Sequence, residues 1–256
     1  MKKLFKLVKL PFKTAFLFVK TPFLRHDEKI KKYKNLHKGE RCFIVATGPS
    51  LKAEDLDLIK NEYSFSMNSI MKSFDKTDWR PTYYVVTDPV AYEACKPLIN
   101  KNDFKQMFFR KGLEKSNVNT DVLRFSVNSW KFIVISYLRR INIKIGNKPS
   151  RKIRKYFNDA PSVVFSIIQL AIYMGFSEIY LLGQDCNYET KTHSDIASVE
   201  YKIKPTNRNA LSIIEAFESY STALNRYSLK IYNATRGGKL EVFPRVNLDD
   251  IVKKGE

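Results

Sequence analysis

Cysteine, histidine, glycine and acidic residues are all scarce in this sequence of 256 residues. The three cysteines, Cys42, Cys95 and Cys186, form no CxxC pair, which argues against a disulfide framework and against a cysteine-based zinc site. We therefore expect a reducing compartment. The 9 glycines and 10 prolines exclude a collagen-like or linker protein, and an apolar share of 44% excludes a disordered chain. The length predicts one domain with an appendage.

The shortage of acidic residues leaves a strongly basic chain. Lysine and arginine number 45 against 26 aspartates and glutamates, which gives a net charge of +19. A net positive charge of this size predicts an anionic partner. The candidates are a nucleic acid, an acidic membrane surface and a phosphorylated substrate. Residues 1–40 hold 12 of the basic residues and 3 of the acidic ones, so nearly half of the net charge lies in less than a sixth of the chain.

The charge excess begins with residues 1–24, which contain six lysines and no acid. At helical spacing the lysines fall on one face and apolar residues on the neighbouring face, a pattern typical of a helix in a membrane interface. The lysines are Lys2, Lys6, Lys9, Lys13 and Lys20, and the apolar residues are Phe5, Val8, Phe12, Phe16, Val19 and Phe23. Packing on the domain and binding of nucleic acid are the alternatives.

This segment is predicted neither to span a membrane nor to be a signal peptide. Its longest uncharged run, Thr14–Val19, is too short for a bilayer, and lysines interrupt every apolar stretch. Pro11 and Pro22 are expected to break the helix into pieces. We interpret residues 1–37 as a basic membrane-associating arm followed by a charged linker, and residues 38–256 as the α/β domain.

From Lys38 onward, short apolar runs alternate with helical patterns. Because the runs are apolar on both faces, they predict a mostly parallel, Rossmann-like sheet flanked by helices. Strands are expected at 41–46, 63–67, 83–87, 107–109, 123–125, 178–183 and 229–232, and helices at 51–61, 91–100 and 209–227. An uncharged stretch predicts a buried helix that starts at Pro161 and Ser162 and stops at Gly175.

Polar or glycine-rich residues follow five of these strands. In parallel sheets ligands bind at the carboxyl ends of the strands, so we expect these residues to share one site. They are Gly48, Pro49, Ser50, Asn68, Asp88, Gln184, Asp185, Asn233 and Thr235. Gly48-Pro49-Ser50 lies between a strand and a helix that Ser50 is expected to cap, and it is either an anion cradle or a structural turn. Asn68 and Asp88 either bind a base or ribose or form Asx turns.

His193 is the candidate catalytic residue, because it is the one histidine of the predicted domain. It lies in a polar segment just past a strand, where a residue that titrates near neutral pH can deprotonate a hydroxyl group. The alternative is a solvated loop histidine. The sequence has no HExxH, Walker, GxSxG or kinase motif, and Asp88 and Asp185 form no DxD pair, so no metal or cofactor is expected.

Several runs together resemble known families. They are KGERCFIVATGPSLKAEDL, FSMNSI, WRPTYYVVTDP, GFSEIYLLGQDCNY, TH and IYNATRGGKLEVFPRV, which span residues 38 to 246 in order. This pattern resembles the MptE-like family, named for 6-hydroxymethylpterin diphosphokinase and widespread in bacterial polysaccharide loci. It is also similar to the bacterial family 42 sialyltransferases, which have a GT-A-variant fold.

The sialyltransferase resemblance implies roles for individual residues. Gly48 to Ser50 would meet the nucleotide phosphates, and Asn68 and Asp88 would line the pocket for CMP or the donor sugar. Ser162 would meet the donor, and His193 would be the catalytic base. Tyr188 would hydrogen-bond the departing phosphate, although its offset from Asp185 differs from the pattern in that family.

The resemblance implies an inverting, metal-independent glycosyltransferase. It would move a sialic-acid-like sugar from a CMP-activated donor to a glycan or lipid-linked acceptor in bacterial surface polysaccharide synthesis. The basic arm would hold this enzyme on the cytoplasmic face of the membrane. A homo-oligomer is compatible with this architecture, and a nucleic-acid partner is not expected. The alternative is an ATP-dependent diphosphotransferase acting on a small heterocycle, for which Asp88 and Asp185 would have to bind Mg²⁺.

Overall fold

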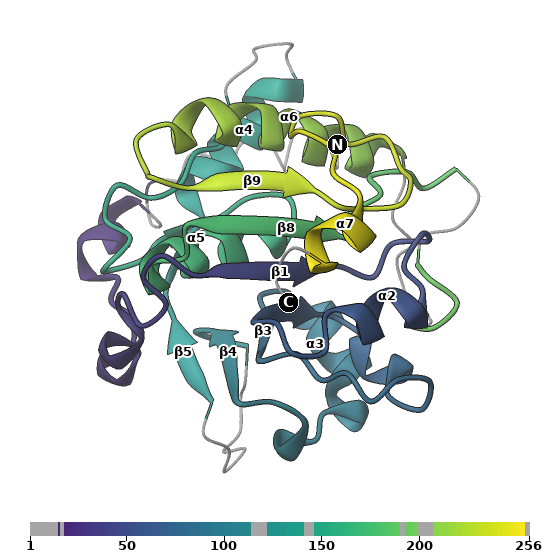
Figure 1. Ribbon diagram of the computed structural model, residues 1–256. Helices are drawn as coiled ribbons and strands as arrows, with labels where there is room; N and C mark the ends of the chain where they lie inside the picture. Colours follow the sequence, from purple (N-terminus) through teal and green to yellow (C-terminus); the bar gives the residue numbers. More distant parts are fainter. Residues whose placement is uncertain are drawn as a thin grey trace.

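The computed structural model describes residues 15, 18–113, 122–140, 146–189, 193–198 and 207–253. A seven-stranded, fully parallel sheet with the order β5-β4-β3-β2-β1-β8-β9 is the centre of the molecule (Figure 1). Its strands are β1 Arg41–Val45, β2 Ser64–Met67, β3 Tyr83–Val86, β4 Gln106–Arg110, β5 Leu123–Phe125, β8 Glu178–Leu182 and β9 Lys230–Asn233. The predicted fold class is confirmed, and each of the seven predicted strands is present. A second, two-stranded sheet pairs β6 (Val127–Asn128) with β7 (Phe157–Asn158).

Helices cover both faces of the large sheet, and a hydrophobic cluster lies on each side. The cluster on one face includes side chains of α5 and α6, and the cluster on the other includes side chains of α2, α3 and α7. The α-helices are α2 Ala53–Leu58, α3 Pro89–Cys95, α4 Trp130–Arg140, α5 Val164–Met174, α6 Asn207–Leu224 and α7 Leu248–Lys253. The 3-10 helices are η1 Thr21–Phe23, η2 Glu28–Tyr33, η3 Ile70–Ser73, η4 Lys96–Leu98 and η5 Lys101–Asp103.

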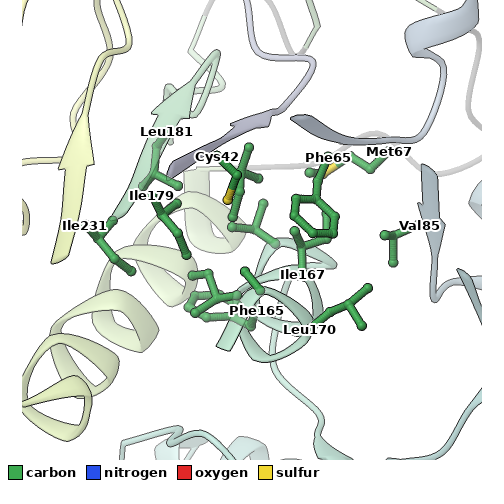
Figure 2. Packing of buried hydrophobic residues seen from close by; sticks show 14 of the residues in the cluster. Cys42, Phe65, Met67, Val85, Phe165, Ile167, Leu170, Ile179, Leu181 and Ile231 are labelled. Carbon is green, nitrogen blue, oxygen red and sulfur yellow. The ribbon is translucent and has the colours of Figure 1, made fainter. Parts of the chain in front are cut away.

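Helix α5 is the uncharged stretch that the sequence marked as a core helix. Figure 2 shows its Phe165 and Ile167 packed beneath the strands of the sheet. The helix begins at Val164, two residues after the predicted start at Ser162, and ends at Gly175 in the left-handed conformation that favours glycine. Its buried Gln169 is fully paired, because its amide donates to two carbonyls and its oxygen accepts from two backbone N–H groups.

Residues 26–37, predicted to be a linker, belong to the domain instead. Ile30 and Tyr33 of η2 are buried in the core, and the Tyr33 hydroxyl donates to Gln106 Oε1 at 2.9 Å. The His37 ring is buried and lies 2.6 Å from the Tyr83 hydroxyl. Burial also lowers the pKa of His26 to about 4, so its ring is neutral and fixed on the body. The many charged residues of this segment obscure a pattern of buried residues, Ile30, Tyr33 and His37, at intervals of three and four. These side chains pack onto the sheet.

Most of the predicted membrane arm, residues 1–14 and 16–17, lies outside the described residues. None of the helices described here is both long enough and apolar enough to cross a bilayer.

Candidate functional site

The strand order itself places a crevice at the centre of the sheet. After β1 the chain adds β2, β3, β4 and β5 on one side of β1, and it later adds β8 and β9 on the other side. The strand order therefore reverses between β1 and β8. Ligands of such sheets bind at this reversal, beyond the carboxyl ends of the strands. A small cavity of about 70 Å³ lies there, lined by residues that follow β1, β2 and β8.

A larger cavity of about 510 Å³ shares four of the lining residues of the small one. The shared residues are Asn68, Ser162, Tyr188 and His193. Asp88 lines the large cavity, and Gly48, Gln184 and Asp185 line the small one. The structure therefore brings together eight of the predicted site residues, which come from five separate segments of the chain.

The turn after β1 is closed by hydrogen bonds within the protein. The Gly48 N–H donates to Gly183 O at 2.9 Å, and Ser50 donates to the Asp185 carboxylate through its N–H at 3.2 Å and its hydroxyl at 3.0 Å. A Cβ on Gly48 would lie 2.1 Å from Asp185 Oδ2, so glycine is required for this contact. The predicted anion cradle would need free N–H groups, whereas these are occupied. Ser50 also does not cap the next helix, which begins at Ala53 after Lys52.

Asp185 is therefore a structural residue of this turn as well as a wall of the small cavity. Burial raises the pKa of its carboxyl group, and the two hydrogen bonds from Ser50 oppose that shift. Both of its oxygens accept from Ser50. A group held in this way is poorly arranged to bind a metal ion.

Asn68 and Asp88 occupy special backbone positions at the ends of β2 and β3. Asn68 adopts a positive φ of 52°, and its carbonyl accepts from the Tyr84 hydroxyl at 2.6 Å. Asp88 is the N-cap of α3, because its Oδ1 accepts from the N–H groups of Val90 at 2.8 Å and Ala91 at 2.9 Å. The bond from Val90 closes the Asx turn that the sequence left as an alternative for Asp88, and with the bond from Ala91 it caps α3 at the edge of the cavity.

Asn233 and Thr235 follow β9 but do not line either cavity. The Asn233 side chain donates to Leu240 O at 2.7 Å and accepts from the Thr235 N–H at 3.1 Å. The Thr235 hydroxyl oxygen accepts from the Gln184 N–H at 3.1 Å. Both residues are buried and hold the loop after β9 against the loop after β8, so their part in the site is to position Gln184.

His193 and Tyr188 lie at the junction of the two cavities. Burial lowers the pKa of His193 below its ordinary value of 6.5, so the imidazole is neutral at pH 7 and can accept a proton. Burial also raises the pKa of Tyr188 to about 12, and electrostatic interactions with Cys186 and Asp185 raise it further. The phenol therefore stays protonated and can donate a hydrogen bond.

The sequence analysis missed Arg110 and Asp159, which also line the large cavity. The Arg110 guanidinium lies 3.3 Å from Asp159 Oδ2 and donates to the Ser129 hydroxyl at 2.8 Å, and that hydroxyl donates to Asp159 Oδ2 at 2.7 Å. This triad fixes a cation at the carboxyl end of β4. The strand-end rule applies to Arg110 as well, because this residue directly follows the predicted strand at 107–109 and is the last residue of β4.

The described residues gather no group of three or more histidine, cysteine, aspartate or glutamate side chains that could hold a metal ion. The two carboxylates that a magnesium-dependent reaction would need, Asp88 and Asp185, are engaged by the α3 N-terminus and by Ser50. Their arrangement does not fit a pair of Mg²⁺ ligands.

The fold and the site define an α/β protein with a cavity at the topological reversal of a parallel sheet. The MAf glycosyltransferase from Magnetospirillum magneticum AMB-1 superposes with a TM-score of 0.52 and 16% identity, over 88% of this chain and 39% of that one. The Campylobacter jejuni sialyltransferases CstII and Cst-I give TM-scores of 0.48 and 0.47 at 17% and 19% identity, covering 82% of this chain and 85% and 82% of theirs. At these identities the likeness concerns the fold and not the chemistry. The comparison with curated proteins gave no match.

A family model described as 6-hydroxymethylpterin diphosphokinase MptE-like matches residues 17–191. The match spans more than half of the 256 residues, and the chain belongs to the MptE-like family. The predicted family resemblance is confirmed. The match also includes residues 26–37, which agrees with their place in the core.

Proposed function

We propose that this protein is a glycosyltransferase that moves a sugar from a CMP-activated donor to a glycan or lipid-linked acceptor. The observation that carries the proposal is the neutral, half-buried His193, which lies with Tyr188, Ser162 and Asn68 at the carboxyl edge of a parallel sheet. The motifs that resemble the family 42 sialyltransferases suggest a sialic-acid-like donor sugar. A cavity of about 510 Å³ is large enough for a nucleotide sugar.

In this proposal His193 accepts the proton of an acceptor hydroxyl while that oxygen attacks the anomeric carbon of the donor. The bond between this carbon and the phosphate oxygen breaks as the new bond forms on the opposite face, so the configuration inverts and CMP leaves. The Tyr188 phenol donates a hydrogen bond to the departing phosphate, which acquires negative charge. A neutral imidazole and a protonated phenol are the forms that these two roles require.

Arg110 places a guanidinium, ion-paired with Asp159, in the same cavity. Asp159 and Ser129 hold the guanidinium in place, so little conformational entropy would be lost when it binds an anion. We propose that it faces the phosphate of the donor or a carboxylate of the donor sugar. The closed turn at Gly48 leaves Arg110 as the described cavity residue best suited to that task.

A second candidate is the diphosphotransferase activity for which the family is named, and membership of that family favours it. That reaction would transfer a diphosphate from ATP to a small heterocycle with the help of Mg²⁺. The engagement of Asp88 and Asp185 by other groups is the observation against it.

Nucleotide binding separates the two candidates. Isothermal calorimetry of the full chain is run with CMP, UDP, GDP and ATP, each in EDTA and in Mg²⁺. Binding of CMP in EDTA, with weaker binding of ATP, supports the glycosyltransferase. Binding of ATP that requires Mg²⁺, with no response to CMP, supports the diphosphotransferase and overturns the first proposal.

We also propose that the protein acts on the cytoplasmic face of the membrane, held there by the basic arm. Six lysines beside a row of phenylalanines within residues 1–24 support this placement. Lipid-linked acceptors would be present at that surface.

A further inference from the structure

A loop far from the arm in sequence concentrates exposed positive charge. Residues 148–155 contain five cations and no acid, and all five side chains are exposed without an ion pair to any described residue. The cations are Lys148, Arg151, Lys152, Arg154 and Lys155. The backbone of this loop is fixed, because the buried Gln169 oxygen accepts from the Ser150 N–H at 2.9 Å and Pro149 O accepts from Arg226 at 3.1 Å.

The described end of the arm runs directly into this loop. The His26 N–H donates to Lys155 O at 2.8 Å, and the His26 ring lies 3.0 Å from Ile153 O. Just before His26, the side chains of Phe18, Val19 and Phe23 are 58%, 64% and 79% exposed. Large apolar side chains exposed to this degree in one short segment mark a contact surface.

We propose that residues 18–25 and 148–155 form one basic–aromatic surface that binds an anionic lipid bilayer. The exposed cations would contact the headgroups, and the exposed phenylalanines and valine would enter the boundary with the acyl chains. A nucleic acid would also attract the cations, but it would leave Val19 and Phe23 exposed to water. The pairing of aliphatic and aromatic side chains with cations therefore favours lipid.

This surface is connected to the cavity through α4. The Phe18 ring meets the Trp130 ring edge-on at a centroid distance of 5.2 Å, and Phe132, two residues further along the same helix, lines the large cavity. Residues two apart lie on nearly opposite sides of a helix, so α4 separates the cavity from the lipid-facing surface by its own width. If the proposed function holds, the acceptor is a lipid-linked molecule that reaches the cavity past α4.

Vesicle binding tests the surface without reference to activity. The full chain is sedimented with phosphatidylcholine vesicles that contain 30% phosphatidylserine or none. The variant Arg151→Gln/Lys152→Gln/Arg154→Gln/Lys155→Gln is expected to lose at least tenfold in partitioning to the anionic vesicles, since each cation near such a surface contributes about fivefold. The control Lys72→Gln/Lys76→Gln/Lys101→Gln/Lys105→Gln removes the same charge from exposed sites elsewhere. It is expected to change partitioning to the anionic vesicles less than threefold. Equal losses in both variants would overturn the proposal.

Intrinsic fluorescence tests the orientation. The chain has two tryptophans, of which Trp79 is fully buried and Trp130 is half-buried beside Phe18. Brominated lipids in anionic vesicles are expected to quench the emission of the full chain, and the Trp130→Phe variant is expected to lose this quenching. Unquenched emission from vesicle-bound protein would contradict the orientation.

The Phe23→Ala variant distinguishes a lipid partner of this surface from a nucleic-acid partner. This variant is expected to weaken vesicle binding severalfold and to leave binding to a double-stranded oligonucleotide unchanged. Oligonucleotide binding that falls tenfold in the quadruple loop variant, with vesicle binding intact, would overturn the lipid proposal in favour of nucleic acid. None of these outcomes depends on the nucleotide that the cavity binds.

Discussion

At the scale of single residues, the environment of His193 sets the expected pH dependence. Because burial lowers its pKa below 6.5, the base form persists to lower pH than in a free histidine. Turnover with a CMP-sugar donor is therefore expected to be flat above neutral pH and to fall along an acid limb whose midpoint lies below pH 6.5. His193→Ala is expected to cut turnover by about 10²- to 10⁴-fold and to remove this acid limb, with CMP affinity nearly unchanged. A rate profile measured from pH 5 to 8 checks both effects.

His193→Gln is the control for the loss of side-chain volume and hydrogen bonding in the alanine variant. Glutamine can form hydrogen bonds but cannot accept a proton at these pH values. This variant is expected to be as slow as the alanine variant. Wild-type turnover in either variant would remove His193 from the mechanism.

Arg110 provides a second test at this scale. Arg110→Met keeps much of the side-chain length and removes the charge, so it is expected to weaken binding of the anionic donor by about tenfold or more. Arg80→Met is the matched control, because Arg80 is a partly exposed arginine that lies outside both cavities. Calorimetry with CMP and with the intact donor measures the change. Equal affinities in the Arg110 variant and the wild type would show that this guanidinium does not meet the ligand.

At the scale of elements, the turn after β1 depends on the absence of a side chain at Gly48. A Cβ there would lie 2.1 Å from Asp185 Oδ2 and 2.3 Å from Gly183 O, so the backbone would have to move. Gly48→Ala is expected to lower the free energy of unfolding by about 2 kcal/mol or more. Gly237→Ala is the control, because its nearest neighbour would be Ser50 Cβ at 3.7 Å, and it is expected to change stability by less than about 0.5 kcal/mol. Urea denaturation compares the two variants.

The start of α3 allows the two roles of Asp88 to be separated. Asp88→Ala removes the N-cap and is expected to lower the free energy of unfolding by about 1 kcal/mol, whereas Asp88→Ser retains a capping oxygen and most of the stability. Denaturation and calorimetry are measured on both variants. Nucleotide binding that is weakened in the serine variant would show a direct ligand contact, and binding that falls in the alanine variant alone would show that Asp88 acts through the helix.

At the scale of the whole molecule, the boundary of the domain is testable by deletion. The described contacts of the N-terminal segment with the body begin at Phe18, whereas Ile30 and Tyr33 are part of the core and His37 is buried. Removal of residues 1–17 is expected to leave the melting temperature unchanged within about 2 °C. Removal of residues 1–37 would delete Ile30 and Tyr33 from the core, and each large core side chain is worth about 2–5 kcal/mol, a large part of the stability of a domain. That variant is expected to be unfolded, as measured by circular dichroism, and a stable fold would restore the linker interpretation.

Much of the fold follows from local pattern. The strands were found because each is a short apolar run, and α5 because a stretch without charge ends at Gly175. Residues 26–37 were misassigned because four exposed lysines dominate the composition of the segment, although four of its other side chains are buried. A segment is buried when the residues along one of its faces are apolar. Its overall composition does not show this, because composition counts the exposed faces as well.

The sequence by itself determined the alternation of strands and helices, the family, and the set of polar residues at strand ends, because these depend on the order of residues along the chain. The tertiary structure alone decided which of those residues share a cavity. In the folded chain Asp185 accepts a hydrogen bond from Ser50 in the Gly48 turn, and Asn233 donates to Leu240 O within its own loop. Arg110 lies beside Asp159, which is 49 positions away in the sequence. A hydrogen bond to a distant segment depends on how the chain is folded in space, and spacing along the sequence carries no record of that partner.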